Sequence, residues 1–278
     1  MATAINIEDL KILRSQLGTG VADTKAALLE ADGDLERATE ILRLKGAKAN
    51  AKKADRPIEE GLVASASVPG GAALITLACE TDFVAKNERF TALADRVVEA
   101  VAGAGSAQSV EQAKLALTAD GSTVGELIDA EAAVLGERIE LVRVSFIQGE
   151  PIEVYLHRSS KDLPPQFGVL VSYAGGDSDS ARAVAQHIAA YSPSVVSRED
   201  VPQEELDREI EILTAIAKQE GKPEAIIEKI IAGKLDSYLK ARALLEQPFA
   251  RDASITVGKF LQDAGMEVLD FARMAVRD

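Results

Sequence analysis

Two parts of the chain repeat one order of predicted elements, a β-hairpin followed by an amphipathic helix. In the first part, "GLVASASV" and "AALITLACE" flank the turn signal "PGG", and apolar residues then recur at helical spacing from Phe90 to Val101. In the second part, "PIEVYLH" and "FGVLVSYAG" flank the polar loop "RSSKDLPPQ", and a helical pattern follows from Ala181 to Tyr191. The order predicts an α+β protein with two related α+β subdomains that contain antiparallel sheets.

Residues 5–45 predict three short helices ahead of these subdomains. An apolar face at helical spacing marks the first helix, and "GTG" at 18–20 ends it. Asp23 is expected to cap the second helix and Asp34 the third, because a carboxylate can accept hydrogen bonds from the free backbone N–H groups of the first turn. The core of so small a unit is limited, so we expect the unit to bind another molecule.

A basic, alanine-rich segment follows the three helices, "KGAKANAKKADRP" from Lys45 to Pro57. It is compatible with a solvated helix or with a linker, and contact with nucleic acid is a minor alternative. The expected boundaries are therefore a three-helix docking domain at 1–46, a linker at 47–57, a core N-terminal subdomain at 58–149 and a core C-terminal subdomain at 150–278.

Two long helical patterns lie within the last of these regions, "QEELDREIEILTAIAKQE" and "PEAIIEKIIAGKLDSYLKARALL". The sequence Gly221-Lys222-Pro223 separates them and is a strong stop signal. Helices joined by so short a connection pack antiparallel. The sequence predicts a protruding antiparallel helical hairpin, inserted at about 202–245.

The charge and the cysteine count narrow the class of protein. The 278 residues carry a formal net charge of −14, which disfavours binding to nucleic acid or to an anionic membrane. Cys79 is the one cysteine, so an intramolecular disulfide is excluded and a reducing compartment is favoured. No apolar run approaches the about 18 residues that span a bilayer, and residues 1–20 carry no signal-peptide pattern. We expect a cytoplasmic protein.

Motifs for nucleotide, metal or covalent chemistry are missing from the sequence. There is no phosphate-binding loop and no dinucleotide fingerprint. His157 and His187 stand apart from any cluster of cysteine or carboxylate at ligand spacing. No serine or cysteine lies in a nucleophile elbow. We therefore expect a protein that is not an enzyme, with no cofactor, no bound metal and no direct nucleotide binding.

The segment "TDFVAKN", residues 81–87, joins the apolar run to the helical pattern. Asp82 can serve as an N-cap and Phe83 as a core residue that closes the sheet over the helix, with Lys86 and Asn87 in a solvated turn. The alternative is that an aromatic side chain beside a carboxylate forms a binding element. The local sequence leaves both interpretations open.

Three longer motifs resemble a known protein family, and this resemblance favours the interpretation of the segment as a binding element. "LGTGVADTKAALLEADGDLERATEILRLKGA" (17–47), "ETDFVAKNERF" (80–90) and "GKPEAIIEKIIAGKL" followed by "QPF" resemble the bacterial elongation factor Ts family, the guanine-nucleotide exchange factors of elongation factor Tu. The resemblance spans nearly the whole chain. It implies that the three-helix unit is a ubiquitin-associated-like domain and that the partner is elongation factor Tu.

The resemblance also assigns roles to particular residues. Thr81, Asp82, Phe83 and Val84 would disturb the Mg²⁺ and phosphate site of elongation factor Tu, with Phe83 as a wedge and Asp82 acting near the ion. Further partner contacts are expected from residues that flank the glycine turn or the motif, and from a histidine in a Tyr-x-His pattern: Arg14, Val21, Lys25, Lys86, Asn87 and His157.

Two other functions are alternatives to nucleotide exchange. One is an adaptor that binds a helix or a ubiquitin-like protein through the N-terminal unit, and the other is an enzyme that uses surface carboxylates. "TDFVAKN" favours exchange, because an adaptor has no use for it. The loop "RSSKDLPPQ" is longer than in some relatives, and Val21-Ala22 is smaller than the methionine pair that some members carry.

Overall fold

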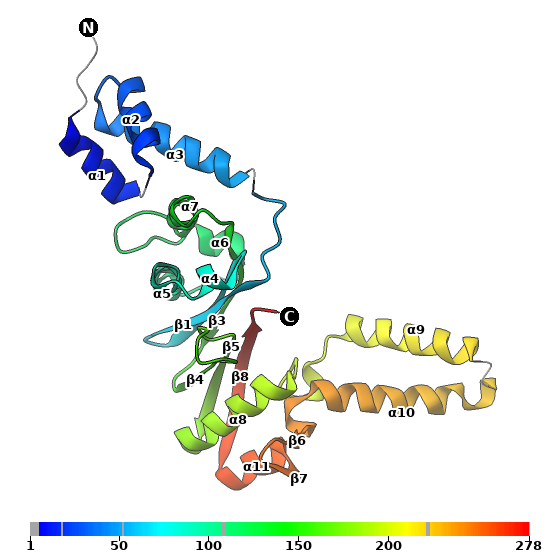
Figure 1. Ribbon diagram of the computed structural model, residues 1–278. Helices are drawn as coiled ribbons and strands as arrows, with labels where there is room; N and C mark the ends of the chain where they lie inside the picture. Colours follow the sequence, from blue (N-terminus) through cyan, green and yellow to red (C-terminus); the bar gives the residue numbers. More distant parts are fainter. Residues whose placement is uncertain (1–5, 18, 52, 107–108, 221–222, 278) are drawn as a thin grey trace. The chain divides into compact units, whose positions relative to one another are not determined.

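The computed structural model describes residues 6–17, 19–51, 53–106, 109–220 and 223–277. It divides into two units: unit 1 comprises Met1–Phe146, Leu156–Gly168 and Met274–Asp278, and unit 2 comprises Ile147–Tyr155 and Val169–Arg273. Figure 1 shows helices together with small sheets in both. The predicted combination of helices and small antiparallel sheets is confirmed.

Unit 1 begins with three helices, as predicted: α1 (Ile7–Leu17), α2 (Val21–Glu30) and α3 (Leu35–Ala51). Apolar side chains from all three helices form a small core, namely Leu13, Ala27, Leu28, Ala31, Ala38 and Leu42. Helix α3 continues to Ala51, into the basic segment, where a helix was one of the two alternatives.

The caps of these helices differ from the prediction at one position. Asp34 caps α3, since its Oδ1 accepts a hydrogen bond from Arg37 N at 3.1 Å. The prediction for Asp23 is wrong, because Gly20 has extended backbone and occupies the N-cap position of α2. Asp23 lies instead in the first turn, where its negative charge interacts favourably with the helix dipole. Gly18 of the predicted break lies outside the described residues.

The sheet of unit 1 has the order β1–β2–β3, formed by β1 (Glu60–Val68), β2 (Gly71–Cys79) and β3 (Ile139–Gln148). Strands β1 and β2 are antiparallel, with Glu60 opposite Cys79 and Val68 opposite Gly71. The central strand β2 is buried at all nine positions, which explains why its sequence is apolar except for Thr76.

Helices cover this sheet and extend its core. Helix α5 (Glu88–Ala104) buries the predicted apolar face, including Phe90, and α7 (Val124–Leu135) begins with a capping box between Thr123 and Glu126. Two short helices were not predicted, α4 (Asp82–Ala85) and α6 (Val110–Lys114). Each is too short to show a hydrophobic period.

A second sheet, with the order β4–β5–β8, belongs mostly to unit 2. Its strands are β4 (Ile152–His157), β5 (Phe167–Gly175) and β8 (Met266–Ala275). Helices α8 (Ser178–Tyr191) and α11 (Val257–Ala264) contribute apolar side chains to the same core. The unit also contains a two-stranded antiparallel sheet and two 3₁₀ turns, namely β6 (Pro248–Phe249), β7 (Asp252–Thr256), η1 (Arg198–Asp200) and η2 (Leu244–Glu246).

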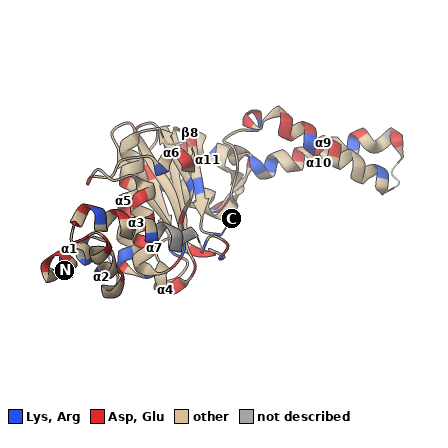
Figure 2. Cartoon of the chain, turned by 90° about the horizontal axis from the view of Figure 1, so that it is seen from above, with Lys and Arg blue, Asp and Glu red and all other residues tan. Residues whose placement is uncertain are grey.

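The two long helical patterns form α9 (Gln203–Gln219) and α10 (Glu224–Arg242), which lie side by side (Figure 1). Acidic and basic residues are interspersed along both helices (Figure 2). Glu205 near the start of α9 accepts hydrogen bonds from Tyr238 and Arg242 near the end of α10, at 2.6 and 2.8 Å, so the helices are antiparallel. Gly221 and Lys222, in the predicted break, lie outside the described residues.

Candidate functional site

The residues between β2 and α5 form what we call the 80–87 loop, which contains the single-turn helix α4. Thr81 has extended backbone, with φ −128° and ψ 155°, and its Oγ1 accepts a hydrogen bond from Val84 N at 3.4 Å. Thr81 is therefore the N-cap of α4, and the interpretation of Asp82 as the cap is wrong. Asp82 is the first helical residue, which leaves its carboxylate available for other contacts.

The side chains of α4 divide between the core and the solvent. Val84 and Ala85 are 8% and 0% exposed and belong to the core of unit 1. Phe83 between Asp82 and Val84 is 80% exposed, so its interpretation as a core residue is wrong. On a single helical turn, burial of Val84 and Ala85 directs the preceding side chain outward. The loop thus presents a large aromatic ring on a backbone that the core anchors.

Asp82 is paired within the loop. Its Oδ2 accepts a hydrogen bond from Lys86 Nζ at 2.7 Å, and the two side chains remain 44% and 39% exposed. This bond lowers the pKa of the Asp82 carboxyl below its ordinary value and raises the pKa of the Lys86 ammonium group. A charged carboxylate is therefore held next to the exposed ring of Phe83.

Asn87 ends the loop and starts the next helix. Its Oδ1 accepts a hydrogen bond from Arg89 N at 2.8 Å, which makes Asn87 the N-cap of α5. The side chain is exposed, as the solvated-turn interpretation expects, but it also has this structural task. A partner contact at Asn87 would have to leave the cap intact.

Glu137 anchors the start of the 80–87 loop, although no local sequence signal points to this residue, which lies 56 positions from Thr81. Its carboxylate accepts hydrogen bonds from Glu80 N at 3.2 Å, Thr81 N at 3.0 Å and Thr81 Oγ1 at 2.6 Å. Cys79 Sγ donates to Thr81 O at 3.3 Å. Burial raises the pKa of the Cys79 thiol to about 12, and the charge of Glu137 adds to the rise, so this thiol is unreactive at neutral pH.

A second group of predicted residues lies at the turn between α1 and α2. Arg14 Nε donates a hydrogen bond to Thr19 O at 3.4 Å. Arg14 therefore lies at the turn that ends where Val21 begins α2. Val21 is 50% exposed and Lys25 is exposed, whereas Thr24 between them is buried and donates to Gly20 O at 2.9 Å. The turn is held from inside and offers Arg14, Val21 and Lys25 on its surface.

His157 lies at the end of β4, apart from both groups in the sequence. Its ring is exposed and tilted by 56° to the ring of Phe167, with 6.1 Å between the centroids. Its backbone oxygen accepts a hydrogen bond from Gln166 N at 2.8 Å, which closes the long loop between β4 and β5. The structure thus joins Thr81–Asn87 in one element, whereas His157 is the last residue of β4.

Comparison with known proteins supplies the family. A model of the family described as elongation factor TS matches residues 80–278. The elongation factor Ts of Leifsonia xyli is 56% identical over 273 residues, which cover 98% of this chain and 98% of the relative. The chain belongs to the elongation factor Ts family. The elongation factor Ts of Clavibacter michiganensis is 54% identical over 96% of this chain and 97% of the relative, and that of Tropheryma whipplei 46% identical over 98% of each.

Membership in the elongation factor Ts family places the chain among factors of protein biosynthesis that act in nucleotide exchange. Within the described residues, no group of three histidine, cysteine or carboxylate side chains is arranged to hold a metal ion. None of the helices in that part of the chain has the length and apolarity needed to cross a membrane.

The second histidine of this elongation factor Ts family member, His187, is a structural residue. Its Nδ1 accepts a hydrogen bond from Ala250 N at 3.1 Å, so its Nε2 is the protonated nitrogen that donates to Gln247 Oε1 at 2.8 Å. Burial lowers the pKa of His187, which keeps the ring neutral. Both ring nitrogens serve to join α8 to the segment from Gln247 to Ala250.

Proposed function

We propose that this protein is the guanine-nucleotide exchange factor of elongation factor Tu and that the 80–87 loop is the part that expels GDP. The observation that carries the proposal is Phe83, which is 80% exposed on a loop that is anchored by the buried Val84 and Ala85 and by the hydrogen bonds of Thr81. Because the backbone is anchored, the exposed aromatic ring cannot bury its apolar surface within its own chain. It can bury that surface in a partner.

The exposed ring can supply the energy needed to distort a partner. Burial of a phenylalanine side chain contributes about 1.5–3 kcal/mol. When Phe83 enters between helices of elongation factor Tu, part of this energy shifts the elements that hold the nucleotide. The distortion is coupled to binding, so a factor that weakens the binding of GDP is itself bound more weakly when GDP is present.

Asp82 acts on the magnesium ion that accompanies GDP in the partner. Mg²⁺ requires nearly ideal octahedral oxygen geometry, so a small displacement of its ligands costs much of its binding. A negative carboxylate that arrives with the wedge disturbs these ligands. Loss of the ion leaves the phosphate charge less compensated, which favours departure of the nucleotide. Thr81 and Val84 serve this step by fixing the backbone on both sides of Asp82 and Phe83.

The rest of the chain provides docking rather than chemistry. We propose that residues 1–46 are a ubiquitin-associated-like domain that binds the partner through Arg14, Val21 and Lys25, followed by a linker at 47–57. Residues 58–149 and 150–278 would be the two core subdomains, with the hairpin at about 202–245 protruding from the second. Lys86, Asn87 and His157 are further contacts. In this proposal the protein works in the cytoplasm, is not an enzyme and binds neither nucleotide nor nucleic acid itself.

Release of labelled GDP tests the proposal. Elongation factor Tu is loaded with a fluorescent GDP, and its release into excess unlabelled nucleotide is followed by stopped flow with increasing concentrations of the purified protein. We expect the release rate to rise with concentration and to saturate. A rate that stays at the spontaneous value throughout would refute the proposed function.

A further inference from the structure

The start of the 80–87 loop is joined to a distant turn by two carboxylates that bond in opposite directions. Glu137, between α7 and β3, accepts three hydrogen bonds from Glu80 and Thr81. Glu80 Oε1 in return accepts a hydrogen bond from Arg138 N at 2.6 Å. Each of the two segments, which lie 57 positions apart, therefore accepts hydrogen bonds from the backbone of the other. We call the carboxylates of Glu80 and Glu137 the carboxylate clamp.

Basic side chains brace the carboxylate clamp on its outer side. Arg56 Nη1 lies 3.2 Å from both carboxylate oxygens of Glu80, whose side chain is only 17% exposed. Arg138 Nη2 donates to Glu140 Oε1 at 2.9 Å, and Arg138 also bonds to Arg56 O. The charge of Glu80 is thus compensated locally, and its carboxylate has a fixed position.

The single turn α4 depends on such a clamp. A helix of four residues has no stability of its own, because nucleation fixes several dihedral angles for one hydrogen bond. Its cap, Thr81, is the residue that Glu137 holds by both its backbone N–H and its hydroxyl. Hydrogen bonds to a charged group are roughly twice as strong as neutral ones. The direction of Phe83, two residues further on, is therefore set from Glu137.

We propose that Glu137 is a positioning residue for nucleotide release, which holds the 80–87 loop in the one orientation that brings Phe83 and Asp82 onto the partner. The inference rests on the proposed exchange function. Without Glu137 the protein still docks through its other surfaces, but the loop is in the productive orientation in only a fraction of the complexes. The release rate at saturating factor then falls, whereas the concentration that gives half of the maximal rate changes little.

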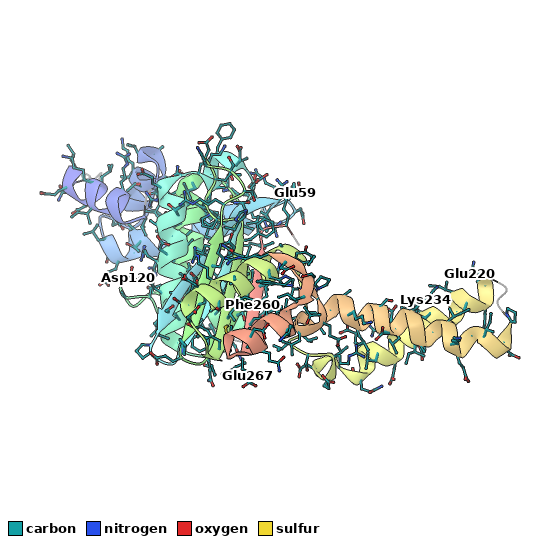
Figure 3. All side chains as sticks on the ribbon, turned by 90° about the horizontal axis from the view of Figure 1, so that it is seen from below. Glu59, Asp120, Glu220, Lys234, Phe260 and Glu267 are labelled. Atoms are coloured by element: carbon teal, nitrogen blue, oxygen red, sulfur yellow. The ribbon has the colours of Figure 1, made fainter. Side chains whose placement is uncertain are left out.

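Glu137→Ala removes all three hydrogen bonds and is expected to lower the saturating release rate about 10-fold, which corresponds to about 1.4 kcal/mol in the barrier. Glu137→Gln keeps an oxygen for the two backbone N–H groups and should restore most of the rate. The matched control is Asp120→Ala (Asp120 is labelled in Figure 3). Asp120 is a carboxylate of unit 1 that accepts hydrogen bonds from Ser122 N and from the hydroxyls of Thr118 and Ser122.

A second measurement reports on the loop in the factor alone. The chain contains no tryptophan, so Phe83→Trp introduces one tryptophan in the loop, which is excited selectively at wavelengths that the four tyrosines do not absorb. Its anisotropy decay is compared with and without Glu137→Ala, and a larger fast component is expected when Glu137 is lost. Should Glu137→Ala be unfolded at the assay temperature, Glu137→Asp replaces it, since the shortened side chain cannot reach both Glu80 N and Thr81 N.

The outcomes separate the two proposals. If the unchanged protein releases GDP and Glu137→Ala releases it equally fast, or if Asp120→Ala loses as much as Glu137→Ala, the positioning role is wrong. An unchanged anisotropy decay also overturns it. If the unchanged protein fails to release GDP, the exchange function is wrong, and the anisotropy comparison still decides whether Glu137 orders the loop.

Discussion

Lys86 Nζ lies 2.7 Å from Asp82 Oδ2, one helical turn away, and the exposed Phe83 directly follows Asp82 in the sequence. The pairing keeps the Asp82 carboxylate ionised and gives it a defined position in the free factor. A partner that uses this carboxylate must compete with Lys86 for it or accept the pair as a unit. The 80–87 loop therefore presents its charge and its aromatic ring already arranged, which lowers the ordering cost of binding.

Replacement of Lys86 by glutamine should raise the pKa of Asp82 toward the ordinary aspartate value, because the hydrogen bond with Lys86 is the largest cause of its lowered pKa. The folded pKa of Asp82 is below the unfolded value, so the pair stabilises the fold above the ordinary aspartate pKa and this contribution is lost as the pH falls through the folded value. Lys86 has a raised pKa, so its contribution is lost as the pH rises through that value.

Carbon-13 NMR titration of the Asp82 carboxyl measures this change directly. Because both side chains are about two-fifths exposed, we expect the melting temperature of Lys86→Gln to stay close to that of the unchanged protein at neutral pH. An Asp82 pKa that is the same in both proteins would show that Lys86 does not set it.

The regular elements could be predicted because their signals are local. Helix α5 follows from apolar residues at helical spacing, and β2 from a run in which Thr76 is the one polar residue and every position is buried. Helix α7 likewise has local end signals, the capping box of Thr123 at its start and Gly136 in the left-handed conformation at its end. In each case, residues within the element or next to it determine whether a helix or a strand forms and where it ends.

The geometry of the site could not be obtained in the same way. Both Thr81 and Asp82 are good capping residues, and the choice between them depends on where β2 ends and on Glu137, 56 positions away from Thr81. Phenylalanine side chains are usually buried, so the residue type alone would not predict that Phe83 is exposed. The packing of Val84 and Ala85 against the core, together with the hydrogen bonds from Thr81 to Glu137, sets the direction of that ring.

Phe83→Ala is predicted to slow GDP release at saturating factor while leaving the fold unchanged. The side chain is 80% exposed, so its loss should change the free energy of unfolding by less than about 0.5 kcal/mol. Leu115→Ala is the matched control, because Leu115 is 73% exposed in the same unit and lies outside the 80–87 loop. Thermal melts and stopped-flow release measure the two effects. Equal release rates for Phe83→Ala and Leu115→Ala would contradict the wedge.

Asp82→Ala is predicted to slow release in the presence of magnesium and to have a smaller effect once EDTA has removed the ion. The carboxylate acts on the neighbourhood of Mg²⁺, whereas Phe83 also displaces the phosphate-binding elements and should retain part of its effect in EDTA. Asp95→Ala, at an exposed position of α5, serves as the control. A deficit of Asp82→Ala that is as large in EDTA as in magnesium would exclude the magnesium route.

Val21→Ala is predicted to weaken association with elongation factor Tu without lowering the saturating release rate. Val21 and Leu29 both lie on α2 and are 50% and 47% exposed, so Leu29→Ala is a close control. Loss of about 1 kcal/mol of apolar contact corresponds to a rise of roughly 5-fold in the half-saturating concentration. The docking role of this turn fails if Val21→Ala and Leu29→Ala give the same half-saturating concentration.

A shortened hairpin is predicted to keep most of the saturating release rate. The structure shows where to cut: Leu244 is fully buried and its backbone N–H donates to Val195 O at 2.9 Å, so removal of all of 202–245 would damage the core of unit 2. Replacement of 209–234 by a short Gly/Ser loop keeps the contacts of Glu205 with Tyr238 and Arg242. We expect this variant to melt cooperatively and to release GDP, and the deletion of 202–245 to melt at a lower temperature. If the shortened protein is folded but inactive, the hairpin takes part in exchange.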